Sequence, residues 1–256
     1  MMRFDVVTLF PELVQSVVGS GVTRRAAEQG LFELHCWNPR RWGSGVHQAV
    51  DDRPYGGGPG MVMQYEPLAA ALAAIRAADA VPVRVIALTP QGRPLDQAAV
   101  RRFSGFSRLA LVCGRYEGID ERLLEAEVEE EWSLGDYVLS GGELAAMALI
   151  DACVRLLPGA LGHDDSAEQD SFTEGLLDCP HYTRPETVAG RAVPAELLTG
   201  HHAHIERWRR REALGRTWER RPDLLARLAL GPGDAALLDE YRRLRSGSAA
   251  GTPSDD

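Results

Sequence analysis

The sequence predicts an α/β protein, with a mostly parallel sheet that has helices on both faces, followed by a small all-helical C-terminal domain. Apolar strand-like segments alternate with helical segments through about residue 158, and this alternation is typical of βαβ units. After Pro158-Gly159 the chain becomes polar and loses its apolar periodicity. From Pro194 onward it is rich in arginine and has a helical pattern.

Each predicted element has a local reason. Residues 83–89 form the strongest β-branched run, which favours a buried strand. Pro11 suits the first turn of a helix, and residues 65–79 are rich in alanine, the best helix former. The expected strands are 4–10, 32–38, 83–89, 108–113 and 128–133; the expected helices are 11–29, 65–79, 95–103, 120–127 and 142–156, with a long loop at 41–63.

The expected domain organisation follows from these changes in character. Residues 1–160 form the α/β domain, and 161–175, with Gly, Asp and Ser, form a flexible interdomain linker. Residues 176–245 form the helical domain. The Gly/Ser/Ala-rich residues 246–256 form a disordered tail.

Composition excludes several classes of protein. The hydrophobic content of 45% and the charged content of 25% are those of a soluble globular protein. There is no apolar run of the roughly 18 residues that a membrane helix needs, and no apolar signal-peptide segment follows Met1. We therefore expect a cytoplasmic protein without a membrane partner. The four cysteines lack the close spacing of a metal or redox motif, so we expect reduced thiols and no metal site.

Charge is unevenly distributed along the chain. The net charge is −9, which argues weakly against nucleic-acid binding. Residues 201–245, however, contain eleven arginines against seven acidic residues. A basic C-terminal segment on an acidic body can bind a phosphate backbone locally. All basic residues are arginine rather than lysine, so arginine content alone is poor evidence for phosphate recognition.

Three glycine-containing loops each follow a predicted strand: Thr89–Arg93, Cys113–Gly118 and Ser133–Gly142. In α/β sheets ligands collect at the carboxyl ends of the strands. Each loop alone is also compatible with a plain turn or a surface ion pair. None has the Gly-x-Gly-x-x-Gly fingerprint of dinucleotide folds. The three together indicate a polar cofactor site, with Glu117 as acceptor for a ribose hydroxyl or an ammonium group.

Other segments leave alternatives open. The glycine-rich loop from Tyr55 to Met61 is either a flexible surface loop or a backbone in close contact with a nucleotide or another chain segment. Asp170 is compatible with a helix cap or a solvated charge. Residues 177–185 are dense in groups that bind bases and phosphates, although His181 is equally compatible with a structural role. Arg207, Arg210 and Arg211 share one helix face, which is either solvated or an RNA site.

Four motifs together resemble those of the bacterial tRNA (guanine-N1)-methyltransferases, which belong to the SPOUT class. The resemblance extends from Phe4 to about Leu244 and lies in residues 52–61, 113–122, 135–144 and 176–185. The chain departs from the pattern at Ala145, where the family usually has proline, and we expect a slightly altered helix start there. The tail after Leu244 lies outside the pattern.

The resemblance implies a fold and an activity beyond what periodicity indicates. It implies a deep trefoil knot, a homodimer with an active site shared between the two chains, and methyl transfer from S-adenosylmethionine to N1 of guanosine 37 in tRNA. By the motif match, Asp170 is the general base and Arg155 stabilises charge on guanine O6. The resemblance also implies magnesium, although no metal site is evident in the sequence.

The motif match also assigns binding residues. The expected cofactor set is Thr89, Pro90, Gln91, Gly92, Gly114, Tyr116, Glu117, Ser133, Leu134, Gly135, Tyr137, Leu139, Gly141 and Gly142. The expected tRNA-binding set is Asp178, Arg184, Arg207, Arg210 and Arg211.

Three rival functions fit these residues less well. A SPOUT enzyme that methylates a ribose 2′-hydroxyl would leave the Asp170 motif without an obvious role. A non-catalytic RNA-binding protein is disfavoured by the intact Asp170, Arg155 and three loops. A nucleotide hydrolase is disfavoured because a P-loop lysine is missing.

Overall fold

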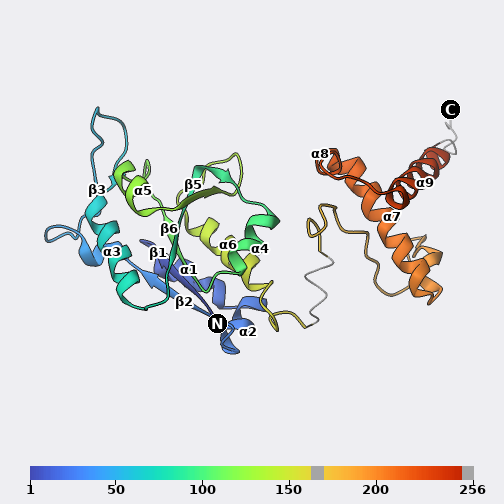
Figure 1. Ribbon diagram of the computed structural model, residues 1–256, viewed down its shortest axis with the longest axis horizontal. Helices are drawn as coiled ribbons and strands as arrows, with labels where there is room; N and C mark the ends of the chain where they lie inside the picture. The colour runs from blue at the N-terminus through green and yellow to red at the C-terminus, as the bar shows by residue number, and fades with distance from the viewer. Residues whose placement is uncertain (163–169, 250–256) are drawn as a thin grey trace. The chain divides into compact units, whose positions relative to one another are not determined.

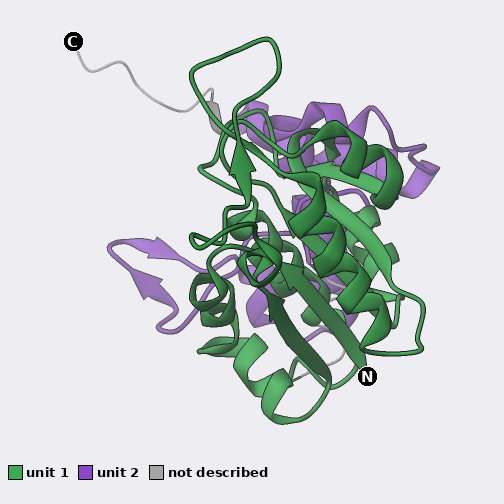
Figure 2. Ribbon diagram, turned by 90° about the vertical axis from the view of Figure 1, so that its left-hand side faces the viewer, with its two compact units in different colours: residues 1–164 green, residues 165–256 purple. Residues whose placement is uncertain are grey.

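The chain divides into two units, Met1–Asp164 and Asp165–Asp256, in a computed structural model that describes residues 1–162 and 170–249 (Figures 1 and 2). The border between the units falls within residues 161–175, the stretch expected to be a linker. Residues 163–169 lie outside the described residues, so the flexibility of the linker stays a prediction. Residues 170–175 form hydrogen-bonded turns at the start of the second unit.

The first unit is built on a five-stranded sheet in which every neighbouring pair is parallel. The strand order is β2-β1-β6-β5-β7. Its strands are β1 (Met2–Val7), β2 (Phe32–Trp37), β5 (Arg84–Pro94), β6 (Arg108–Cys113) and β7 (Glu130–Ser133). Parallel pairing requires a crossover between neighbours, and the helices between these strands supply it. The predicted α/β class with a mostly parallel sheet is confirmed.

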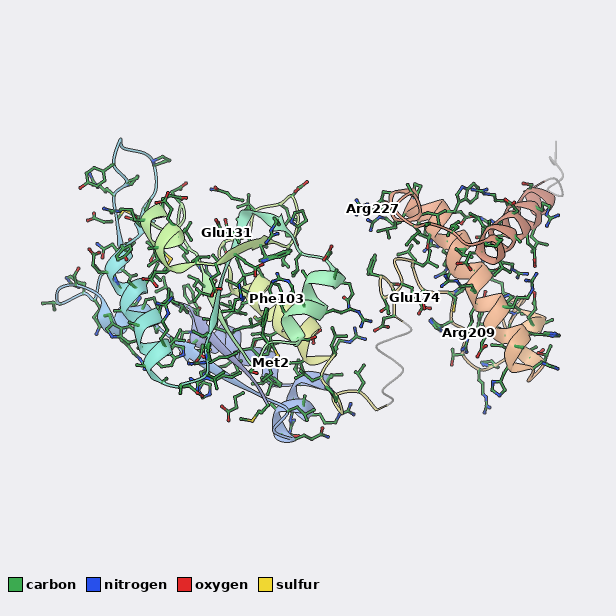
Figure 3. All side chains as sticks on the ribbon, in the orientation of Figure 1. Met2, Phe103, Glu131, Glu174, Arg209 and Arg227 are labelled. Carbon is green, nitrogen blue, oxygen red and sulfur yellow. The ribbon has the colours of Figure 1, made fainter. Side chains whose placement is uncertain are left out.

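Alternate side chains of each strand enter two separate apolar layers, one on each face of the sheet. Phe4, Ile86 and Leu111 pack into one layer, where Met2 and Phe103 also lie (Figure 3). Val85 and Val112 pack into the other. The first layer is covered by α1 (Pro11–Gln15), α2 (Gly21–Glu28), α4 (Gln97–Ser104) and α6 (Glu143–Val154); the second by α3 (Tyr65–Ala77) and α5 (Glu121–Glu127). Because these strands are nearly continuous apolar runs, both faces of the sheet have to be covered by helices.

A buried ion pair joins β1 to the neighbouring strand β6. The Asp5 carboxylate, fully buried in β1, accepts hydrogen bonds from Arg108 Nε at 2.8 Å and from Trp37 Nε1 at 2.8 Å. A buried charge is tolerated only when it is paired and hydrogen-bonded, and here both conditions are met.

Two predicted elements differ in detail from the structure. The helix expected over 11–29 is divided into α1, a 3-10 turn (Ser16–Val18) and α2, because Ser20 is extended at φ −156° and ψ 167°. The loop expected at 41–63 contains the end of a 3-10 helix (Pro39–Trp42) and a short hairpin of β3 (Asp51–Asp52) and β4 (Val62–Met63).

The second unit has a helical core with one small hairpin. Leu176, Leu214, Leu237 and Leu238 pack together between α7 (His202–Arg220) and α9 (Pro232–Ala249), near α8 (Pro222–Leu225). The all-helical expectation missed β8 (Thr187–Val188) and β9 (Arg191–Ala192). Their turn has positive φ at Ala189 and Gly190, as a type I′ hairpin turn requires.

The tail prediction was wrong for its first residues. Helix α9 continues to Ala249, and Ser246 donates a hydrogen bond from its hydroxyl to the Arg242 carbonyl at 2.9 Å. Residues 250–256 of the expected disordered tail lie outside the described residues. The trefoil knot stays a prediction. Within the described ranges, the helices are all too short or too polar to cross a membrane.

Candidate functional site

The three glycine-containing loops meet at one edge of the sheet. Two of the loops follow β6 and β7, and the third, Thr89–Arg93, bulges out of β5 after Leu88. These strands are adjacent in the order β6-β5-β7 and run in the same direction. The carboxyl ends of these strands therefore lie side by side, where α/β sheets bind their ligands.

A cavity of about 480 Å³ opens between these loops, within the size range of small-molecule sites. Thirteen of the fourteen residues expected to bind the cofactor line it. They are Thr89, Pro90, Gln91, Gly114, Tyr116, Glu117, Ser133, Leu134, Gly135, Tyr137, Leu139, Gly141 and Gly142. The structure thus brings together, in one cavity, residues that are up to 53 positions apart.

Gly92 is the exception, and its role in the structure is to pack against a strand. Leu88 and Arg93 both pair with Trp132 of β7, so the residues between them bulge out of the ladder. A Cβ atom on Gly92 would lie 2.3 Å from the Trp132 amide nitrogen, closer than any carbon tolerates. Glycine is needed here so that the Thr89–Arg93 segment can leave the ladder and rejoin it beside β7.

The cavity has an acidic lining of which the motif match anticipated only Glu117. Glu117, Glu121 and Glu131 all line it, and none has an ion-pair partner within residues 1–162 and 170–249. The one lining arginine, Arg115, is paired with the buried Glu143 at 3.0 Å. The cavity therefore carries negative charge. The sequence could have pointed to Glu131 (Figure 3), because an acidic residue within a strand of a parallel sheet is unusual.

The glycine-rich loop at 55–61 contacts another segment of the chain. The Glu117 amide donates to the Met61 carbonyl at 2.9 Å, and the Met63 amide donates to the Gly118 carbonyl at 2.9 Å. Tyr55, near the start of the loop, is fully exposed. The loop therefore supports the cavity loop that follows β6.

The two residues expected to act in catalysis lie in different units. Arg155 caps the C-terminus of α6 in the first unit, and its amide donates to the Asp151 carbonyl at 3.1 Å. Asp170 begins the turn that opens the second unit, and its carbonyl accepts from the Thr173 amide. Their pairing at one active site stays a prediction.

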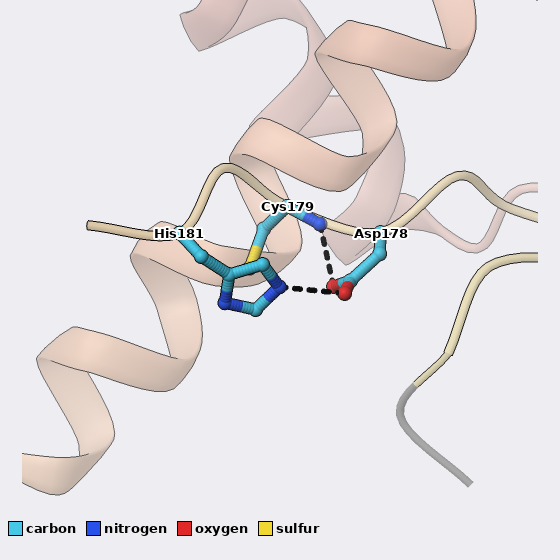
Figure 4. A group of neighbouring side chains, drawn as sticks. All are labelled: Asp178, Cys179 and His181. Carbon is cyan, nitrogen blue, oxygen red and sulfur yellow. Dashed lines mark hydrogen bonds and ion pairs between the residues drawn. The ribbon is translucent and has the colours of Figure 1, made fainter. Parts of the chain in front are cut away.

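Asp178, expected to bind tRNA, orients a histidine (Figure 4). Its carboxylate lies 2.7 Å from His181 Nε2 and accepts from the Cys179 amide at 2.6 Å. Partial burial alone would raise the pKa of Asp178, but these hydrogen bonds outweigh burial and hold the pKa below its ordinary value. The side chain is therefore an anion at neutral pH, with its position fixed by the turn.

Asp178, Cys179 and His181 also form the one group with metal-ligating spacing among the described residues, with ligand atoms within 4.8 Å of one another. A thiol and an imidazole are poor ligands for magnesium, which prefers oxygen. Burial raises the pKa of the Cys179 thiol to about 11, so the thiol stays protonated at neutral pH. This group does not fit the magnesium that the resemblance implies.

The arginine face expected to bind RNA holds two helices together. Arg207 and Arg211 both pair with Glu240 of α9, and Arg210 pairs with Asp234 at 2.7 Å. Arg210 also pairs with Glu174. Sequence alone could not predict these partners, because they come from segments 24 to 36 residues away.

A different face of α7 carries arginines without ion pairs in the described part of the chain. They are Arg209 (Figure 3), Arg216 and Arg220. Their spacing of seven and four residues places them on one side of the helix. Sequence reasoning missed this face because periodicity alone does not distinguish paired from unpaired arginines.

Arg184, also expected to bind tRNA, is exposed in the segment before β8. It has no ion-pair partner among the described residues. Its guanidinium is therefore accessible to a phosphate in solution.

Comparison with known proteins identifies relatives over nearly the whole chain. Residues 2–227 match the family model described as tRNA (Guanine-1)-methyltransferase TrmD. Proteins named tRNA (guanine-N(1)-)-methyltransferase from Pseudomonas entomophila (strain L48) and Pseudomonas fluorescens (strain SBW25) are each 59% identical over 247 residues, covering 96% of this chain and 99% of theirs. The protein of that name from Stutzerimonas stutzeri (strain A1501) is 58% identical over the same coverage. The chain therefore belongs to the tRNA (guanine-1)-methyltransferase family, TrmD.

Proposed function

We propose that this protein transfers a methyl group from S-adenosylmethionine to N1 of guanosine 37 in tRNA. The observation that carries the proposal is the acidic cavity at the carboxyl ends of β5, β6 and β7, lined by the loops that the family motifs contain. Membership of the family supports the substrate class.

The charge of the cavity suits this methyl donor. S-adenosylmethionine carries a sulfonium and an ammonium group against a single carboxylate, so it is a net cation. Glu117, Glu121 and Glu131 attract such a ligand and repel the phosphates of a nucleotide. The apolar lining residues, among them Leu134 and Leu139, provide surface for an adenine ring.

The reaction requires a base and a stabiliser of negative charge. Guanine N1 carries a proton in the neutral base, and Asp170 accepts this proton as the N1–carbon bond forms. The bond from carbon to sulfur breaks, and its electron pair remains on sulfur as the thioether of S-adenosylhomocysteine. Negative charge that develops on O6 is stabilised by the Arg155 guanidinium. Because the neutral thioether is a good leaving group, positioning supplies much of the rate.

The proposal places the substrate across both units and two chains. Each active site combines the cavity of one protomer with Asp170 of its partner in a homodimer. Asp178 and Arg184 hold the tRNA, together with the arginines of α7. Arg207, Arg210 and Arg211 hold α7 in place against α9, and the unpaired Arg209 face binds phosphate directly.

Analysis of the methylated nucleoside tests the proposal. The protein is incubated with S-adenosylmethionine and unmodified tRNA bearing guanosines at positions 36 and 37, and the RNA is then digested. We expect 1-methylguanosine, lost by at least about a hundredfold in Asp170→Asn. The control is Asp239→Asn, which removes an exposed carboxylate of α9 and leaves activity unchanged. Methyl transfer to a ribose would refute the assignment of the acceptor atom.

A further inference from the structure

Glu143 is a buried carboxylate beside the cavity that does not line it. Its side chain is 1% exposed at the first position of α6. The Thr8 hydroxyl donates to its Oε1 at 2.9 Å, and Arg115 Nε donates to its Oε2 at 3.0 Å. Both oxygens are thus satisfied by partners 135 and 28 residues away. A buried charge held this completely has a defined position.

Arg115 connects Glu143 to both cavity loops. Its Nη1 donates to the Ser140 carbonyl at 3.1 Å. Its guanidinium lies over the Phe10 ring, 4.4 Å from the centroid. The two loops also pair through their backbones, since the Gly142 amide donates to the Gly114 carbonyl at 3.0 Å.

Gly141 makes this arrangement possible. A Cβ atom at this position would lie 2.2 Å from Arg115 Nε. The guanidinium therefore crosses directly over the backbone of the Ser133–Gly142 loop. Arg115 and Gly141 also form an isolated antiparallel bridge. The side chain and the backbone thus hold the two loops in one register.

We propose that Glu143 is a positioning residue for the cofactor, acting through Arg115. It fixes the Arg115 guanidinium, which clamps the loop after β6 to the loop after β7 and keeps the cavity in its binding shape. This inference rests on the proposed use of the cavity for S-adenosylmethionine. Without the carboxylate, the partly buried Arg115 guanidinium loses its ion-pair partner, leaves its place, and frees both loops.

A purely structural role would give a different result, and the chain contains a matched control. Asp5 is another fully buried carboxylate of the same unit, paired with Arg108 at 2.8 Å and remote from the cavity. Thr23 is another buried threonine whose hydroxyl is bonded, to the Val17 carbonyl. Glu143→Gln is therefore compared with Asp5→Asn, and Thr8→Val with Thr23→Val.

The test measures cofactor affinity and thermal midpoint on the full-length protein. Calorimetric titration with S-adenosylmethionine and with S-adenosylhomocysteine gives the affinities. We expect Glu143→Gln to bind both about tenfold more weakly, and Thr8→Val a few fold more weakly. Asp5→Asn and Thr23→Val lower the thermal midpoint by as much or more but keep wild-type affinity.

A double-mutant cycle shows whether Glu143 acts through Arg115. If it does, Glu143→Gln adds nothing to the loss of affinity already caused by Arg115→Met. Additive losses would overturn the inference. So would equal loss of affinity in Glu143→Gln and Asp5→Asn, since that result would indicate stability alone.

The outcome for the wild-type protein separates this inference from the proposed function. If the wild type fails to bind either ligand, both are overturned. If it binds them but methylates a ribose, the proposed function fails, while the measured affinities still decide the role of Glu143. If it forms 1-methylguanosine and Glu143→Gln binds normally, the inference alone fails.

Discussion

Substituting Gly215 with alanine should destabilise the second unit while leaving the cavity of the first unit intact. Gly215 is buried in the middle of α7, against Tyr241 of α9. An added Cβ atom would lie 2.3 to 2.4 Å from three ring carbons, Cδ2, Cε2 and Cγ. Normal carbon contacts are about 3.5–4.0 Å. Because Tyr241 is itself buried, its ring cannot turn into solvent, and α9 must move.

The magnitude follows from two opposing effects. Glycine to alanine within a helix ordinarily gains about 1 kcal/mol. Overpacking of a filled core costs about 1–3 kcal/mol or more, and an overlap of more than an ångström with three atoms belongs at the upper end. The net loss is therefore about 1–2 kcal/mol. For a unit of this size that lowers the thermal midpoint by roughly 4–8 °C per kcal/mol.

Gly233→Ala is the matched control, because Gly233 lies in α9 with nothing within 4 Å of the added Cβ. It should keep or raise the midpoint through helix propensity alone. Calorimetry gives the midpoint of each variant, and titration with S-adenosylmethionine and with tRNA gives the affinities. Gly215→Ala should retain cofactor affinity and lose tRNA affinity. A Gly215→Ala midpoint equal to that of Gly233→Ala would refute the reasoning about packing.

Three further predictions concern the site and its neighbours. Gly92→Ala should lower the free energy of unfolding, measured by urea denaturation, by about 3 kcal/mol and weaken cofactor binding, because the new Cβ would overlap the Trp132 amide. An unchanged free energy of unfolding would contradict the close approach of Gly92 to Trp132. The lowered pKa of Asp178 gives stability that is fully present above its unfolded value of about 3.9 and is lost as pH falls through the lower folded value. Asp178→Asn should therefore reduce the loss of unfolding free energy as pH falls in the acid range, and His181→Gln should reduce it in part. An unchanged pH dependence would show that these hydrogen bonds do not stabilise the folded protein. Glu131→Gln should weaken binding of S-adenosylmethionine about fivefold, or ~1 kcal/mol, with less effect on the uncharged-sulfur product in calorimetry; equal losses for both ligands would show that its charge does not select the sulfonium.

The sequence by itself determined the order and type of the main elements. The apolar runs at residues 4–7 and 108–113 and the alanine-rich segment at residues 65–77 are local signals, and each element formed close to where the pattern placed it. The glycine-containing motifs determined which loops line the cavity, since backbone freedom is also encoded locally. Thirteen of fourteen expected cofactor residues lie together for that reason.

The tertiary structure alone decided which charges are paired. Arg210 and Arg211 looked like an RNA-binding face, yet their partners Asp234 and Glu240 lie on α9. Gly92, an expected ligand contact, is also required by the close approach of the neighbouring strand. The partnership of Thr8, Arg115 and Glu143 joins residues up to 135 positions apart. Pairing at such separations depends on how helices and strands pack, because burial and electrostatic partners are properties of the folded chain that no local pattern contains.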